Sequence, residues 1–183
     1  MRVPGAALRV LTTKRLMLRP FTTDDLEVHA SLYADPDVTR WLSDGPWLGD
    51  AARTRSERAV RRFVAHWKEH GFGVWAVERD GRFLGQCGLN TLDNDEVEIL
   101  WALDRTAWGY GFATEAARAA LRYGFDVVSL DRIVALARPE NGPSRRIMDK
   151  LGMHWEKDVE AFGRPAVYYS VVATDPRARG DQS

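Results

Sequence analysis

The chain has 183 residues, 45% of them hydrophobic and 28% charged, a composition typical of one globular domain. It carries 26 basic and 26 acidic residues, so no overall field draws it to nucleic acid or to a membrane surface. The single cysteine, Cys87, excludes an internal disulfide and fits a reducing compartment. Because the N-terminal residues have no apolar signal core and no membrane-spanning run follows, we expect a cytoplasmic protein without membrane contact.

The first seventy residues predict one strand and two helices. Residues 15–21 have the pattern of a strand, and Thr22 or Thr23 then caps a helix that opens with two aspartates. A loop rich in glycine, proline and tryptophan follows at 41–50. In the second helix, apolar residues recur every three or four positions until Gly71 ends it.

The middle of the chain predicts three strands, at 73–78, 82–89 and 96–103. Asp80-Gly81 between the first two is a strong signal for a two-residue hairpin turn. In the third strand the apolar residues from Val97 to Leu103 alternate along one face. Glu98 therefore points to the opposite face, together with Leu100 and Ala102.

The last third predicts a helix at 113–125, a strand at 132–138, a helix at 143–151 and two strands around Gly163-Arg164-Pro165. This element order indicates one mixed α/β domain, because a doubly wound domain would alternate strand and helix more regularly. We assign the domain to residues 8–173. The polar tail, 174–183, is expected to be disordered.

The segment from Trp108 to Thr114 lies between a predicted strand and a predicted helix. Its glycines, Gly109 and Gly111, permit a tight turn whose amides face an anion at the positive end of the helix dipole. By itself the segment fits an ordinary turn equally well. A Walker loop requires a lysine that is absent here, and for a dinucleotide fingerprint Asp131 lies at the wrong edge of the sheet.

Three segments carry a resemblance to a known family. WALDRTAWGYGFATEAARAALRYGF (101–125), RPENGPSRRIMDKLGM (138–153) and TKRLMLRPFTTDDL (13–26) are similar to the GNAT acetyltransferases, in particular the RimJ/RimL branch of ribosomal-protein N-acetyltransferases. The resemblance extends over about residues 11–172. It implies a mixed, mostly antiparallel sheet flanked by helices and splayed between the fourth and fifth predicted strands, 96–103 and 132–138.

The resemblance also implies a binding site for acetyl-CoA. The loop amides would hold the pyrophosphate, the end of the preceding strand would pair with the pantetheine arm, and Asn141 would bond to that arm. Trp108 departs from the Gln or Arg usual in the general motif. The implied cofactor residues are Trp101, Ala102, Leu103, Trp108, Gly109, Tyr110, Gly111, Phe112, Ala113, Thr114, Asn141, Ser144 and Arg146. An alternative role for Asn141 is a turn and helix cap.

The chemistry implied is transfer of acetyl from acetyl-CoA, by direct attack, to a primary amine of a protein N-terminus or a small molecule. Glu98 is the candidate base and Glu96 the lesser one; either is otherwise an ordinary strand residue. The tyrosine that often acts as the acid is replaced by Met148. The resemblance to the RimJ/RimL branch implies Ser144, three residues after Asn141, as the acid instead, and the alternative role of Ser144 is a helix cap. A non-catalytic acyl-CoA sensor of the same fold is the alternative function. We expect no metal, no nucleic acid and a possible homodimer.

Three other features have competing interpretations. Trp41 and Trp47 are candidate residues of the acceptor pocket, or else a minor core cluster or an oligomer contact. The segment from His66 to His70 matches an inverted zinc-peptidase motif, but we interpret it as a chance match at a helix end. The arginines between Arg53 and Arg62 favour a solvated helix face over a basic patch for RNA or an acidic substrate.

Overall fold

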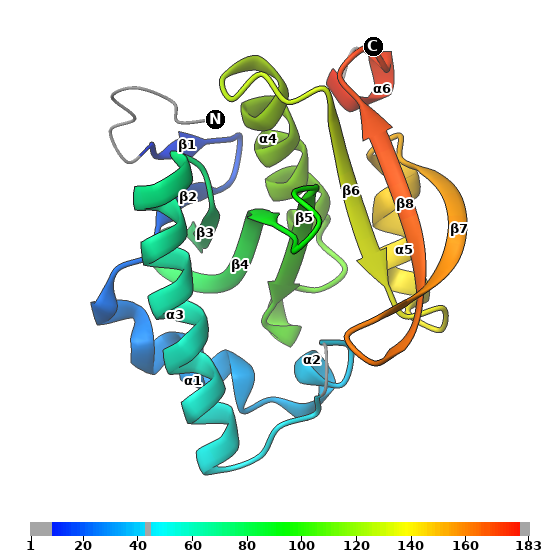
Figure 1. The fold of residues 1–183 in the computed structure, drawn as a ribbon. Coiled ribbons are helices and arrows are strands. Elements are labelled where there is room, and N and C mark those ends of the chain that lie inside the picture. Colours follow the sequence, from blue (N-terminus) through cyan, green and yellow to red (C-terminus); the bar gives the residue numbers. More distant parts are fainter. Residues whose placement is uncertain (1–8, 43–44, 180–183) are drawn as a thin grey trace.

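The computed structural model describes residues 9–42 and 45–179, and in this part of the chain eight strands form one sheet in the order β1-β2-β3-β4-β5-β6-β8-β7 (Figure 1). The strands are β1 (Leu11–Thr12), β2 (Met17–Pro20), β3 (Val74–Arg79), β4 (Arg82–Thr91), β5 (Val97–Leu103), β6 (Arg132–Ala137), β7 (His154–Ala161) and β8 (Arg164–Val172).

The sheet splays where β5 meets β6. All other neighbouring strands are antiparallel, and β4 and β5 share seven register pairs. By contrast, β5 and β6 are parallel and share a single pair, Glu98 with Val134. The predicted mixed sheet, open between these two strands, is confirmed.

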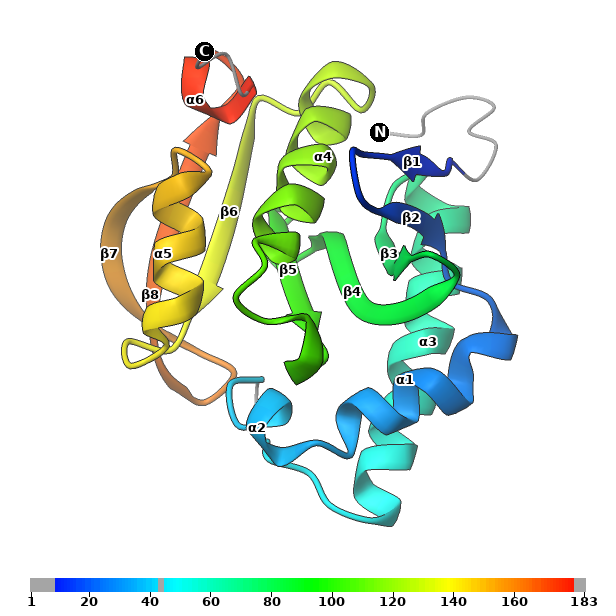
Figure 2. The same ribbon diagram turned by 180° about the vertical axis from the view of Figure 1, so that it is seen from behind.

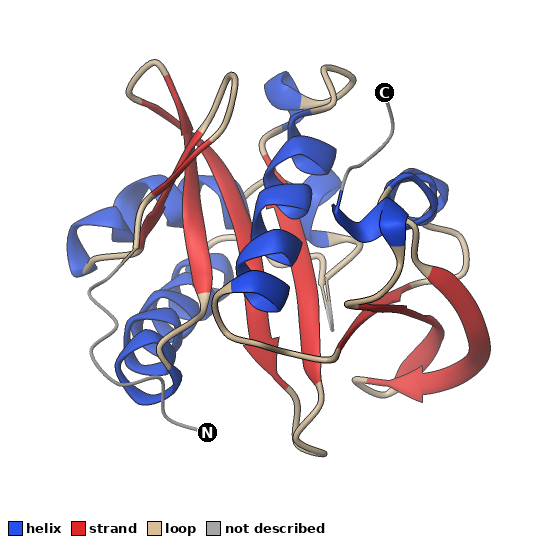
Figure 3. Cartoon of the chain, turned by 90° about the horizontal axis from the view of Figure 1, so that it is seen from above, coloured by secondary structure: helices blue, strands red, loops and turns tan. Residues whose placement is uncertain are grey.

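Helices cover both faces of this sheet (Figure 3). The helix α3 lies in front of β2–β4 in Figure 1, whereas α4 and α5 lie in front in the reverse view of Figure 2. The α-helices are α1 (Leu26–Tyr33), α2 (Pro36–Thr39), α3 (Asp50–His70), α4 (Phe112–Asp126), α5 (Gly142–Lys150) and α6 (Pro176–Arg179), and two 3-10 turns span Thr23–Asp25 and Arg105–Ala107.

Local sequence signals explain the ends of these elements. Thr22 and Asp25 form a capping box ahead of α1, and Gly71 ends α3 in the left-handed conformation, with its N–H donating to the Trp67 carbonyl at 3.0 Å. Asp80 and Gly81 both have positive φ, as a two-residue hairpin turn requires. These three sequence predictions are confirmed.

The two faces of β5 belong to different parts of the core. Ile99 and its alternate neighbours pack in the cluster that includes α4, where Ala116, Ala117 and Ala120 are fully buried and let that helix sit close to the sheet. Ala102 packs instead in the cluster formed with α1 and α3. Residues of one face of a strand alternate with those of the other, so Glu98 is on the face opposite Ile99, as predicted, and the structure shows that this is the α3 side.

The structure differs from the sequence predictions at two places. After Asp35 the chain forms α2, because the Asp35 carboxylate caps it and Pro36 occupies its first turn. Within the tail that we expected to be disordered, Pro176–Arg179 form α6, and Asp175 just before it accepts from the Arg177 backbone N–H at 2.9 Å. The bounds of the domain stay a prediction. Residue 8, where we began the domain, and residues 180–183 lie outside the described residues. No helix in the described part is long and apolar enough to cross a membrane.

Candidate active site

The splayed strands β5 and β6 line a cavity of about 910 Å³. Its walls come from α1–α3, from the end of β5 and the loop to α4, and from the turns before α5 and β8. The structure brings together in this cavity most of the residues predicted from the sequence: Trp41, Trp47, Glu98, Trp101, Ala102, Leu103, Trp108, Gly109, Gly111, Ala113, Thr114, Asn141, Ser144 and Arg146.

Tyr110 and Phe112 are the two predicted cofactor residues whose side chains do not line the cavity. The Phe112 ring is buried in the core under the guanidinium of Arg15, which lies 4.6 Å from the ring centroid. Tyr110 is 63% exposed and stacks on Phe112 at 5.7 Å. Any contribution of these two residues to the site is therefore through their backbone amides, while their rings support the loop from behind.

The loop before α4 presents a row of free backbone donors. Gly109 and Gly111 have φ of +83° and +79°, which turns the chain so that Gly111 begins the 15-residue α4. None of the six N–H groups from Gly109 to Thr114 donates to an acceptor among the described residues. Free amides at the positive end of a helix form a binding site for an anion such as a pyrophosphate.

Side-chain hydrogen bonds fix this loop in place. The Trp108 indole N–H donates to the Leu103 carbonyl at 2.7 Å, which ties the loop to the end of β5. Arg15 donates to the Tyr110 carbonyl at 3.0 Å and also pairs with Glu115 at 2.6 Å. The donors are therefore held ready before a ligand arrives.

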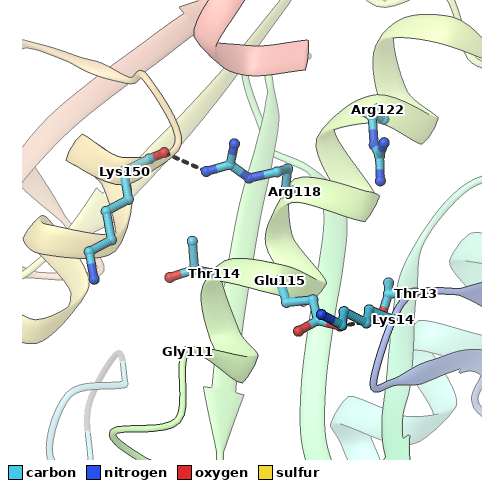
Figure 4. Close-up of a pocket in the computed structure, with 8 residues that line it drawn as sticks. All are labelled: Thr13, Lys14, Gly111, Thr114, Glu115, Arg118, Arg122 and Lys150. Atoms are coloured by element: carbon cyan, nitrogen blue, oxygen red, sulfur yellow. Dashed lines mark hydrogen bonds between the residues drawn. The ribbon is translucent and has the colours of Figure 1, made fainter. Parts of the chain in front are cut away.

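A second cavity, of about 450 Å³, continues the first along α4 (Figure 4). The two cavities share Gly111, Thr114 and Lys150. Sequence reasoning missed its basic residues, Lys14, Arg118, Arg122 and Lys150. The available signal was helical spacing: Arg118 and Arg122 follow Thr114 at intervals of four residues and so lie on its face of the helix.

Asn141 and Ser144 stand at the start of α5. Asn141 is 7% exposed, and its side-chain oxygen accepts from the Ser144 backbone N–H at 3.2 Å, so it caps the helix and also lines the cavity. The Ser144 hydroxyl bonds to no described residue, whereas Met148 is buried in the core and does not reach the cavity. Asn141 can therefore cap α5 and line the cavity at the same time.

Glu98 is a buried carboxyl at the cavity wall. It is 8% exposed, and Asn90 Nδ2 donates to its Oε1 at 3.1 Å. Burial raises the pKa of Glu98 to about 7, although Asn90 and the charge of Arg62 act in the opposite direction. A carboxyl with this pKa exchanges a proton readily near neutral pH.

The environment of Glu96 differs from that of Glu98. Glu96 accepts from the Tyr168 hydroxyl at 2.6 Å and pairs with Arg132 at 2.9 Å. The Tyr168 hydrogen bond, followed by weaker attractions, lowers the pKa of Glu96, and its side chain does not line the cavity. Of the two candidates, only Glu98 lines the cavity and has a raised pKa.

The far end of the cavity is aromatic and basic. Trp47 packs against Tyr33 at 5.1 Å, and the Arg55 guanidinium lies 5.4 Å from the Trp47 ring centroid. Arg55, Arg58 and Arg62 of α3 also line this end. Arg58 and Arg62 are exposed, as predicted for a solvated helix face, and Arg55 is half-buried, but their spacing also puts all three on one stripe beside the cavity.

Two further candidates have structural roles. His66 Nδ1 lies 2.8 Å from the Phe72 carbonyl, and its Nε2 accepts from the Thr91 backbone N–H at 3.1 Å, so both ring nitrogens are engaged in the fold. Cys87 is fully buried, and burial raises the pKa of its thiol well above the usual range, as expected for a structural cysteine.

The sheet splays beside a helix N-terminus with free amides, and the resulting cavity is suited to an anionic ligand. The family model for the acetyltransferase (GNAT) domain matches residues 15–154, so the chain belongs to the GNAT acetyltransferase family. Enzymes of this family use acetyl-CoA, and the row of free amides before α4 fits its pyrophosphate.

Individual relatives agree with this assignment. The chain is 36% identical to the protein YkkB of Bacillus subtilis over 87% of its own length and 93% of that protein. A crystal structure of a GNAT-family acetyltransferase from Bacillus anthracis superposes with a TM-score of 0.74 at 26% identity, covering 91% of this chain and all of the other. Mycobacterium smegmatis RimJ in complex with CoA-disulfide, at 24% identity, shares the fold with a TM-score of 0.75 over 93% of this chain and 89% of that one.

Proposed function

We propose that this protein transfers the acetyl group of acetyl-CoA to a primary amine by direct attack, with Glu98 as the base and Ser144 as the proton donor to the leaving sulfur. The acceptor is the α-amine of a peptide or the amine of a small molecule. Two relatives support the class: the spermidine N(1)-acetyltransferase of Escherichia coli is 27% identical over 78% of this chain, and the FsC-acetyl coenzyme A-N(2)-transacetylase of Aspergillus fumigatus is 28% identical over 85%.

The observation that carries the proposal is the position of Glu98, a buried carboxyl on the cavity wall whose pKa is raised to about 7. Amines are ammonium ions at neutral pH, and an ammonium has no lone pair with which to attack a carbonyl. Glu98 lies on the cavity wall at the point where β5 and β6 begin to separate, and its pKa is about 7. A carboxylate there can remove the proton from an entering ammonium.

Bound acetyl-CoA supplies the acetyl group as a thioester with an electrophilic carbonyl carbon. Glu98 takes one proton from the ammonium, and the amine nitrogen then bonds to that carbon as the carbon–sulfur bond breaks. The nitrogen loses its second proton to water. Ser144 donates a proton to the sulfur and recovers one from solvent, and Glu98 releases its proton to solvent, so each turnover yields an amide, a thiol and one net proton.

The position of Ser144 suits it to the role of proton donor. It lies in the first turn of α5, three residues after the Asn141 cap, and its hydroxyl bonds to no described residue. The tyrosine position of the wider family holds the buried Met148, which has no proton to give. A hydroxyl at the cavity wall is the simplest replacement.

The test is thiol release from acetyl-CoA with a panel of peptides and small amines, run beside thermal denaturation at rising coenzyme A concentration. We expect the melting temperature to increase with coenzyme A, since a ligand of the native state stabilises it by mass action, and at least one amine to release thiol. No thermal shift at millimolar coenzyme A would overturn cofactor binding. A shift without turnover on any amine would favour an acyl-CoA sensor instead.

A further inference from the structure

Basic side chains outnumber acidic ones at the cavity wall. Of its described lining residues seven are lysine or arginine, and Glu98 is the one acid. The whole chain has equal numbers of basic and acidic residues, so composition does not explain this excess. A cavity lined with one sign of charge concentrates ligands of the opposite sign.

The cofactor accounts for only part of this charge. Arg146 and Lys150 belong to α5, on the side of the sheet where α4 presents its free amides, and they fit the phosphates of coenzyme A. Arg58 and Arg62 belong to α3, which covers the opposite face of the sheet (Figures 1 and 2). Their charges therefore act on the acceptor half of the cavity.

The arginines of α3 divide into two groups. Arg53 pairs with Glu27 at 2.6 Å, and Arg61 is exposed away from the cavity. Arg58 and Arg62 are exposed as well, but they lie one helical turn apart on the cavity side, and neither forms an ion pair with a described residue. Arginine presents a planar fork of N–H donors that matches a carboxylate or a phosphate.

The opposite wall of the acceptor half adds two more guanidinium groups. Arg138 follows β6 and Arg164 begins β8, and both line the cavity. Burial, and then the charge of Arg164, lower the pKa of Arg138, whereas the charge of Glu140 raises it, so the guanidinium groups of Arg138 and Arg164 lie close enough to repel one another. An anion bound beside them would relieve this repulsion.

We propose that the acceptor is a primary amine that also carries a carboxylate or phosphate group, with its ammonium at Glu98 and its anionic group at Arg58, Arg62 and Arg164. This inference rests on the proposed acetyl transfer and names its substrate class. The same arginines disfavour a polyamine, because each further ammonium group would meet a guanidinium of like charge.

Matched acceptors that differ in charge test the inference. We would compare kcat/KM for 2-aminoethyl phosphate with that for ethanolamine and putrescine, and for a peptide with aspartates at its second and third positions with the asparagine version. These two comparisons distinguish a small-molecule acceptor from a peptide N-terminus. In at least one of them we expect kcat/KM to be about tenfold or more higher for the anionic acceptor, and we expect this preference to shrink as salt is added.

In the variant Arg58→Gln, the ratio of kcat/KM for the anionic acceptor to kcat/KM for its uncharged or cationic counterpart should fall towards one. Arg61→Gln is the matched control, because it removes the same charge from the same helix outside the cavity and should keep the preference. Equal or faster turnover of the neutral and cationic amines, or a preference unaffected by Arg58→Gln, would overturn the inference and leave the acetyl transfer intact. If no acceptor released thiol, the proposed function would fail. A calorimetric titration of the protein–coenzyme A complex with 2-aminoethyl phosphate would then test the inference, and absence of binding would overturn it.

Discussion

Asn90 and Glu98 lie directly opposite one another on the paired strands β4 and β5, and Asn90 Nδ2 donates to Glu98 Oε1 at 3.1 Å. Glu98 is also the residue through which β5 pairs with Val134 of β6. The carboxyl is thus held by a neighbouring strand at the point where the sheet splays. This position gives the group both its burial and its access to the cavity.

Replacing Glu98 with glutamine should stabilise the protein at alkaline pH. The folded-state pKa of about 7 is above the ordinary value of 4.5, so the native state binds this proton more tightly than the unfolded chain. Stability from this group is full below the ordinary value and falls as pH rises to about 7. Denaturant unfolding near pH 8 should show a gain of up to about 3 kcal/mol for Glu98→Gln, and near pH 4 almost none.

Glu96→Gln is the control for that measurement, and its effect has the opposite sign. The hydrogen bond from Tyr168 lowers the pKa of Glu96, so its contribution is present at neutral pH and is lost as pH falls. This variant should therefore be less stable than the wild type near pH 8. A pH-independent effect of Glu98→Gln would contradict the burial argument.

Gly109→Ala should weaken acetyl-CoA binding. Gly109 has φ of +83° and Gly81 has φ of +76°, and a Cβ at either position meets no atom within 4 Å. Both alanine variants should lose about 1–2 kcal/mol of stability through the left-handed backbone. Only Gly109→Ala, in the loop of free amides, should raise the KM for acetyl-CoA. An equal KM in both variants would show that the amides do not hold the cofactor.

Two substitutions at Asn141 separate its two roles. Asn141→Asp keeps the oxygen that caps α5, whereas Asn141→Ala removes the cap and should cost about 1 kcal/mol. Both remove the side-chain N–H donor from the cavity, so both should raise the KM for acetyl-CoA. Thermal unfolding and steady-state kinetics measured together test this. A normal KM in the aspartate variant would reduce Asn141 to a helix cap.

Ser144→Ala should lower kcat by about tenfold or more if the hydroxyl protonates the leaving sulfur. Ser144→Thr keeps a hydroxyl at the same place and should retain most of the activity. Because the Ser144 hydroxyl bonds to no described residue, neither change should shift the melting temperature much. Full activity in the alanine variant would transfer the role of the acid to another group or to water.

The sequence predicted those features that depend on short-range patterns. Capping at Thr22, the Asp80-Gly81 turn and the alternation along β5 are decided by residues close together in the chain, and each was found as expected. Tyr110 and Phe112 show the limit of this reasoning, because which way a loop side chain points depends on the core packed behind it. The resemblance to a family located the cofactor loop, which spacing alone left ambiguous.

The acceptor half of the site needed the three-dimensional structure. Arg58 on α3 and Arg164 on β8 are far apart in the sequence and come together only because the splayed sheet puts both beside one cavity. The raised pKa of Glu98 likewise depends on burial between strands and α3, which no local pattern reports. Helical spacing alone was compatible with either a solvated or a cavity-facing stripe of arginines.

The most direct test of the central claim is the pH dependence of kcat/KM for wild type and Glu98→Gln, with coenzyme A affinity measured in parallel. For the wild type, kcat/KM should rise with pH and level off above about 7, where Glu98 is ionised. The glutamine variant should lose about 10²–10⁴-fold of the plateau value while binding coenzyme A normally. Equal activity of the two proteins, or a wild-type profile that is flat through neutral pH, would contradict the role of Glu98 as the base.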